Sequence, residues 1–225
     1  MLTCGILEDI EKEIGKRLYA LENPENETFS ENIWNVGLKN LDYSEQKYLT
    51  NILSFASSLD YNHPGLKPKV YLAHPIRVAG ITVLLSQKTE KKILGTISLI
   101  HNVLEVSSIT YEKLESEVGP LVGNSIKILT VERNLQDKSD YLNNYYKGIA
   151  STSHSLAVVK IIDKLDNLFT LGLNTNDEIR NRYLNEIENY VLPLVDYYLP
   201  DLTAYMYKLV TYNRENGVID KKKYL

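Results

Sequence analysis

The amino-acid sequence predicts an all-α fold, and three features support that prediction. Apolar residues recur at steps of three and four along almost the whole chain, which is the spacing of one buried helix face. No segment alternates apolar and polar residues in the manner of a half-buried strand. Proline and glycine separate the periodic segments, as at Gly119-Pro120 and Leu199-Pro200.

The first 60 residues are expected to form three helices. The first carries an apolar stripe made of Ile6, Ile10, Ile14, Leu18 and Leu21. Thr28 and Glu31 have the spacing of a capping box for a short second helix. Ser44 is predicted to cap a third helix that ends near Leu59. We interpret residues 1–40 as an N-terminal helical extension and 41–225 as the main domain, because the motifs described below all lie beyond residue 40.

The rest of the chain is expected to continue as helices after a loop. Two prolines and a glycine predict that loop over residues 60–69. Pro75 would stand in the first turn of the next helix, where its missing N–H loses no hydrogen bond, so that His74 lies at the helix start. The expected helices cover about 73–86, 90–105, 110–118, 120–133, 137–149, 154–172, 177–198 and 200–213.

Composition limits the classes of partner. The formal charge of -4 provides no basic surface for nucleic acid. A single cysteine, Cys4, excludes an intrachain disulfide framework and is typical of a reducing compartment. The N-terminus lacks the pattern of a secretory signal, and no stretch approaches the ~20 apolar residues of a membrane span. These features predict a cytoplasmic protein without a membrane or nucleic-acid partner; they carry no information on its oligomeric state.

Three apolar segments, far apart in sequence, contain isolated polar side chains. They hold His74 in 71–79, His101 and Asn102 in 99–105, and Asp163 in 160–168. An ionisable group is costly to bury unless it is paired or bound to a metal. We therefore predict that these four side chains converge on one ion. A buried histidine can equally be a hydrogen-bonded core residue, and a buried aspartate can pair with a nearby lysine, so spacing alone leaves both interpretations open.

The predicted donor set has a definite chemistry. Two imidazoles, an amide oxygen and a carboxylate suit a borderline divalent cation such as Mn, Fe, Ni or Zn. Such an ion lowers the pKa of a bound water toward neutrality, which provides a nucleophile for a phosphorus centre. On a continuous helix Glu105 would lie four residues after His101 and three after Asn102, so we expect it on the same face as a general acid or base.

Taken together, these segments resemble the HD-domain phosphohydrolases, and within them the hydrolase domain of the RelA/SpoT family. Residues 71–79, Tyr-Leu-Ala-His-Pro-Ile-Arg-Val-Ala, are similar to the family's Tyr-hydrophobic-x-His-Pro-x-x-Val-Ala. Residues 160–167, Lys-Ile-Ile-Asp-Lys-Leu-Asp-Asn, are similar to its Lys-Leu-Ala-Asp-Arg-Leu-His-Asn. Residues 109–122 resemble its threonine-initiated helix and the turn that follows. The similarity extends from about Tyr71 to Leu173.

The resemblance implies an HD-domain helical bundle that uses bound manganese to remove pyrophosphate from the 3′ position of (p)ppGpp. The partner would be a small-molecule nucleotide. The metal ligands implied are His74, His101, Asn102 and Asp163. The substrate-binding candidates are Lys67 and Lys69 for phosphates, Tyr145 for stacking on a base, and Asn167.

Two positions depart from the family pattern. The His-Asp pair that gives the domain its name is His101-Asn102 here, and the Glu-Asp pair that follows is Glu105-Val106. A neutral amide oxygen can still bind a metal, but the site loses one negative charge and should hold a divalent ion less tightly. Two hypotheses therefore stand. The chain is either a metal-dependent phosphohydrolase or a degenerate HD domain that binds a nucleotide or a protein without turnover.

Overall fold

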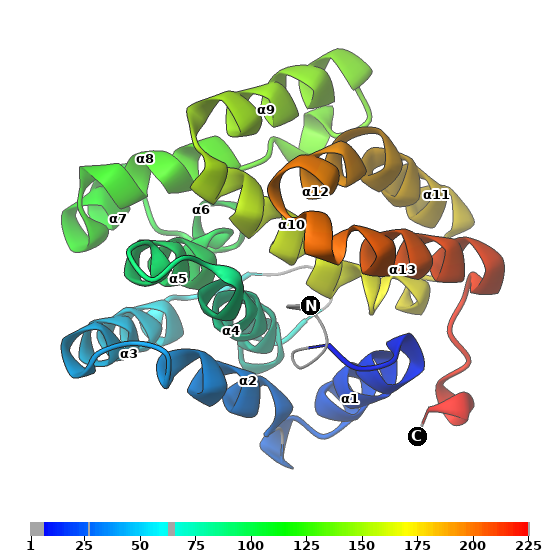
Figure 1. Cartoon of the computed structure of the whole chain (residues 1–225), viewed down its shortest axis with the longest axis horizontal. Helices are drawn as coiled ribbons and strands as arrows, with labels where there is room; N and C mark the ends of the chain where they lie inside the picture. Colours follow the sequence, from blue (N-terminus) through cyan, green and yellow to red (C-terminus); the bar gives the residue numbers. More distant parts are fainter. Residues whose placement is uncertain (1–6, 27, 63–65, 225) are drawn as a thin grey trace. The chain divides into compact units, whose positions relative to one another are not determined.

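The computed structural model describes residues 7–26, 28–62 and 66–224 (Figure 1). Within these ranges the chain forms helices and no strand; a single antiparallel bridge joins Tyr61 to Ser107. The predicted all-α fold is confirmed. Among the described residues, no helix combines the length and apolarity of a membrane span.

The chain divides into two compact units. The central unit consists of Ser30–Lys160, and the terminal unit combines Met1–Phe29 with Ile161–Leu225. The division falls within one continuous helix, α10 (His154–Leu168). The predicted boundary at residue 40 stays a prediction.

The central unit is built around two helices that pack along each other, α4 (Pro68–Leu85) and α5 (Lys91–Ile100). Every residue of α5 from Leu94 to Ile100 is buried. Helix α5 also packs on α3 (Tyr43–Ser58) and α8 (Pro120–Leu129). The other helices of this unit are α2 (Phe29–Leu38), α6 (Val103–Val106), α7 (Tyr111–Val118), the 3-10 turn η3 (Arg133–Leu135) and α9 (Ser139–Thr152).

The terminal unit joins the two ends of the chain. Helix α1 (Ile10–Glu22) buries Ile10, Ile14 and Leu18, as the apolar stripe predicted. The described C-terminal segment runs back to α1, where Lys221 pairs with Glu22. This unit also contains α11 (Asp177–Glu186), the π-helical turn η5 (Ile187–Val191), α12 (Leu192–Tyr198) and α13 (Thr203–Asn216). Short 3-10 turns lie at η2 (Pro24–Asn26), η4 (Leu171–Leu173), η6 (Pro200–Leu202) and η7 (Lys221–Lys223).

The start of α4 differs from the prediction. The helix begins at Pro68, five residues earlier than expected, and contains Pro75 in its interior. Pro68 occupies the first turn, where a proline needs no donor, so the prediction assigned that role to the wrong proline. Pro75 removes one internal N–H donor, which the packed helix tolerates. His74 therefore lies within α4 and not at its start.

Two further predictions about helix ends were wrong. The helix expected at 90–105 is interrupted at His101-Asn102, where Asn102 has φ -109° and ψ 5° and begins the separate helix α6. Glu105 donates its N–H to the Asn102 carbonyl at 2.9 Å, which closes a tight turn and not a continuous α-helix. Asp42, and not Ser44, caps α3, because its carboxylate and the Glu45 side chain form a reciprocal capping box.

Candidate functional site

Two histidines meet where α4 and α5 pack in the central unit. His74 lies in the middle of α4, and His101 follows the last residue of α5. Their ring centroids are 5.3 Å apart in an edge-to-face arrangement, and a nitrogen of each ring lies within 4.8 Å of one of the other. His101 is buried and His74 is half-buried. The packing of α4 on α5 therefore brings together two side chains that are 27 residues apart in sequence (101 minus 74).

The end of α5 determines which nitrogen His101 can offer. The last carbonyls of a helix have no partner within it, and Ser98 is one of these residues. The Ser98 carbonyl oxygen lies 2.7 Å from Nδ1 of His101. Because a carbonyl can only accept, Nδ1 donates this hydrogen bond, and Nε2 is the ring nitrogen left to face a metal ion. Holding one ring nitrogen in this way is how proteins orient a metal-binding histidine.

Asp163 lies on the part of α10 that belongs to the terminal unit and is only 3% exposed. Asn167, one turn later, donates from its amide nitrogen to Oδ1 of Asp163 at 2.8 Å. This bond fixes the direction of the carboxylate on the helix. His74, His101 and Asp163 are a group of described side chains that could hold a metal ion. The sequence singled out all three.

Asn102, the fourth predicted ligand, is half-buried and precedes the first residue of α6. Its backbone lies in the sparsely populated bridge region, a conformation found at many active-site residues. Its role as a ligand stays a prediction.

Glu105, the predicted acid or base, is directed at the segment that follows α8. Its Oε1 accepts the Val131 N–H at 3.0 Å, and its Oε2 lies 3.8 Å from Nε of Arg133. The side chain is 8% exposed. Both carboxylate oxygens therefore connect α6 to the 131–133 segment. Its catalytic role also stays a prediction.

The predicted substrate-binding residues lie in different surroundings. Lys67 is exposed and immediately precedes α4, while the side chain of Lys69 lies outside the described part of the structure. The half-buried Tyr145 donates its hydroxyl to the Leu129 carbonyl at 2.5 Å. Its ring stacks on Tyr141 with a centroid separation of 6.0 Å. One face of the Tyr145 ring is therefore partly covered by Tyr141, and a nucleotide base would have to stack beside Tyr141 or on the other face.

Glu13 and Arg17 on α1 are buried ionic residues that the sequence prediction did not single out. Their exposed fractions are 1% and 0%. Opposite charges four residues apart, beside the buried Ile14 and Leu18, were the available signal. Opposite charges with this spacing are equally common on solvent-exposed helices. The sequence alone therefore could not show that this pair is buried.

The known proteins that are similar to this chain agree with the resemblance of its three motif segments to the RelA/SpoT hydrolases. No protein-family profile matches the chain. A guanosine-3′,5′-bis(diphosphate) 3′-pyrophosphohydrolase of Aquifex aeolicus is 30% identical over 126 residues, which are 55% of this chain and 18% of that protein. The MESH1 enzyme of Danio rerio, which has the same activity name, is 28% identical over 134 residues, or 59% of this chain and 73% of that protein.

The chain is a homologue of these ppGpp hydrolases. The resemblance to the RelA/SpoT hydrolases is thereby confirmed. The solved structure of a metazoan SpoT orthologue reported to hydrolyse ppGpp superposes with a TM-score of 0.57 and 21% identity, covering 76% of this chain and 97% of the other. This likeness establishes the HD-domain fold. The aligned region is about a fifth of the length of the Aquifex relative, so the activities of that longer protein are proposals for this chain.

Proposed function

We propose that the protein is a metal-dependent phosphohydrolase that removes pyrophosphate from the 3′ position of (p)ppGpp. The observation that carries the proposal is the His74–His101 pair, in which Ser98 fixes one ring by its Nδ1 proton. Similarity to proteins that are named for this reaction supports the choice of substrate. The proposed catalytic domain is residues 41–225, and the proposed place of action is the cytoplasm.

The proposed metal ligands are His74, His101 and Asp163, with Asn102 as a weaker fourth. Imidazole and carboxylate donors together fit a borderline or hard divalent cation, and we favour Mn. Such a cation, when bound, supplies Lewis acidity and a water of lowered pKa. The chain itself presents Nε2 of His101 and orients the Asp163 carboxylate through the amide of Asn167.

Glu105 is the proposed general acid or base. Its contacts with Val131 and Arg133 hold the carboxylate in place, and proton transfer would require one of its oxygens to reach the reacting water. Lys67, Lys69, Tyr145 and Asn167 are the proposed contacts to the nucleotide.

A second candidate function is binding of a nucleotide or a protein without turnover. Asn102 and Val106 favour it, because they replace two carboxylates of the family pattern. The engagement of Glu105 by the 131–133 segment favours it as well, since this carboxylate is already committed to the fold.

Pyrophosphate release from ppGpp, measured with purified protein and added Mn, tests the proposal. We expect release that is lost in His101→Ala and retained in His154→Ala, a matched histidine control because His154 is exposed at the start of α10. Metal binding without release from ppGpp or other nucleotides would reject the hydrolase and leave the binding function. Absence of both would reject the metal site.

A further inference from the structure

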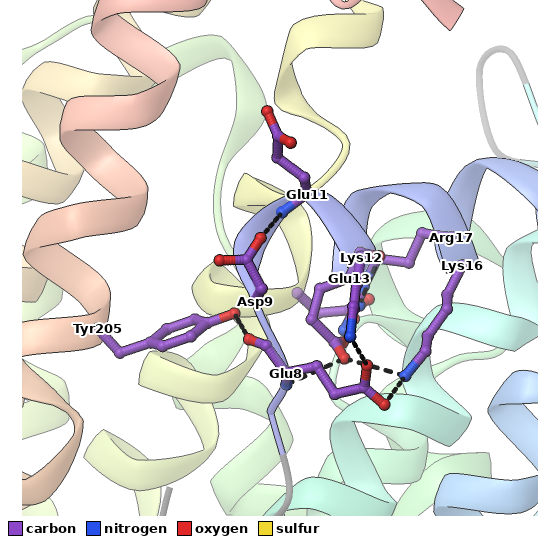
Figure 2. A network of polar contacts seen from close by, with 9 residues as sticks. Glu8, Asp9, Glu11, Lys12, Glu13, Lys16, Arg17 and Tyr205 are labelled. Atoms are coloured by element: carbon purple, nitrogen blue, oxygen red, sulfur yellow. Dashed lines mark hydrogen bonds and ion pairs between the residues drawn. The ribbon is translucent and has the colours of Figure 1, made fainter. Parts of the chain in front are cut away.

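The terminal unit contains a buried ionic triad that links α1 to α10. Arg17 places Nε and Nη2 each 2.8 Å from Oδ1 of Asp166, and its Nη1 lies 2.6 Å from Oε2 of Glu13. The exposed fractions of Arg17, Asp166 and Glu13 are 0, 1 and 1%. Figure 2 shows Glu13 and Arg17 on α1, next to the outer ion pairs of Glu8 with Lys12 and Lys16.

The surroundings of Arg17 fix its orientation as well as its charge. The guanidinium lies 5.2 Å from the ring centre of Phe29 and 4.1 Å from that of Phe169. A planar cation between aromatic rings keeps its plane, and its nitrogens keep their directions. The second oxygen of Glu13 accepts the Glu8 N–H at 3.3 Å, so the far end of the triad is also anchored.

A buried ionic group of this kind is weak as a source of stability. Removing charges from water costs about as much as their attraction returns, and apolar side chains of similar volume often stabilise a protein equally well. What the triad adds is a fixed orientation of α10 relative to α1. Apolar contacts tolerate small rotations of a helix, whereas a rigid guanidinium whose Nε and Nη1 are hydrogen-bonded to two different carboxylates restricts the arrangement.

The orientation of α10 matters because this helix carries a proposed metal ligand and the residue that orients it. Asp163 precedes Asp166 by three residues, and Asn167, which orients Asp163, follows Asp166 directly. In an α-helix these side chains turn together, so holding Asp166 sets the rotation of its neighbours. We propose that Arg17 is a positioning residue for the metal site: it sets the rotation of α10 that presents Asp163 and Asn167. The consequence for the metal rests on the proposed function.

Helix α1 would then contribute to the metal site through Arg17. Helix α1 precedes the region 71–173 that resembles the hydrolase family, and Asp166 stands where the family pattern has histidine. The anion that receives Arg17 is therefore itself a departure of this chain, which supplies the matching cation from its own N-terminal helix.

Two variants test whether the triad positions α10 or only stabilises the fold. Glu13→Gln/Arg17→Met/Asp166→Leu replaces the triad without leaving a buried charge, and Arg17→Lys keeps the charge but loses the fork. Arg214→Met, which removes an ion pair with Glu188 in the same unit, is the matched control. The readouts are hydrogen exchange at the Asn167 side-chain amide and the amides of 161–168, followed by NMR, and the Mn affinity in solution.

We expect both triad variants to melt near the wild type, to exchange about tenfold faster at the Asn167 amide and to bind Mn about tenfold more weakly, as when an outer-shell partner of a ligand is lost. The control should change neither readout. Wild-type exchange at Asn167 in a folded Arg17→Lys protein would overturn the inference even if the triple variant fails to fold. A wild type that binds no metal would instead reject the proposed function, and exchange at Asn167 alone would then decide the role of Arg17.

Discussion

Asn102 is the residue at which a single charge most directly sets the strength of the proposed metal site. Asn102→Asp restores the carboxylate of the family pattern in a half-buried position. We expect Mn affinity to rise at least about tenfold, or ~1.4 kcal/mol, because the added charge attracts a divalent cation. Isothermal titration would measure the change.

Asn102→Ser is the control for that experiment, since it alters the side chain without adding charge. Equal affinity in the Asp and Ser variants would mean that residue 102 does not face the ion. Val106 is less suited to the same test. It is 3% exposed and its carbonyl accepts the Asn62 N–H at 2.7 Å, so Val106→Asp would place a charge in the core.

Tyr61 is expected to make the free energy of unfolding fall at alkaline pH. Burial raises the pKa of its phenol above the ordinary value. Below pH ~10 the folded and unfolded chains both keep the proton, and the full stability is present. As the pH rises further, the unfolded chain loses the proton first, so the free energy of unfolding falls until the folded pKa is passed.

Tyr61→Phe is therefore expected to lose less stability than the wild type between pH 8 and pH 11. Urea unfolding at the two pH values measures the difference. Tyr197→Phe is the control, because Tyr197 is 78% exposed. A wild type and a Tyr61→Phe variant with the same pH dependence would contradict the expected role of this phenol.

At the scale of elements, one crossing of helices depends on the absence of a side chain. A Cβ on Gly80 of α4 would lie 2.8 Å from the Ile33 carbonyl oxygen on α2. We expect Gly80→Ala to destabilise the protein by about 1–3 kcal/mol, as for an overpacked core. Gly148 on α9 has no neighbour within 4 Å of such a Cβ, so Gly148→Ala should stabilise by about 0.5–1 kcal/mol. Thermal unfolding compares the two, and opposite signs are expected.

Most helices could be predicted because apolar periodicity is local, but their ends could not. Leu99, Ile100, Val103 and Leu104 keep helical spacing across the break at His101-Asn102, so periodicity cannot detect a two-residue turn. Caps have a similar ambiguity. Residues 42 and 44 are both good capping types, and the decisive signal was Glu45 three residues after the first of them.

The site was predictable to the extent that its residues interrupt apolar segments. His74, His101 and Asp163 do so, and they form a group that could hold a metal ion. Ser98 and Val131 act through backbone groups, which any residue type provides, so no sequence pattern identifies them. Arg17 acts through a partner 149 residues away, and such a contact follows only from the fold.

At the scale of the whole chain, the terminal unit depends on residues from both ends. Deleting residues 1–22 would remove α1, with the buried Ile10, Ile14 and Leu18, and would leave Asp166 without Arg17. Each large apolar side chain contributes about 1.5–3 kcal/mol, so we expect a loss of several kcal/mol. Urea unfolding measures it, with Tyr19→Ala as a control at an exposed position of the same helix. An unchanged midpoint would show that residues 1–22 do not contribute to the stability of the terminal unit.

The two-part construction of the terminal unit has a consequence for biosynthesis. Arg17 of α1 is synthesised 149 residues before its partner Asp166. At translation rates of about 5–20 residues per second, roughly 7 to 30 s pass before α1 can meet its partner. The central unit is complete only at Lys160, six residues before Asp166, so the apolar stripe of α1 has no partner from the terminal unit while the central unit is being synthesised. The terminal unit can therefore complete its core only after residues 161–225 have been synthesised.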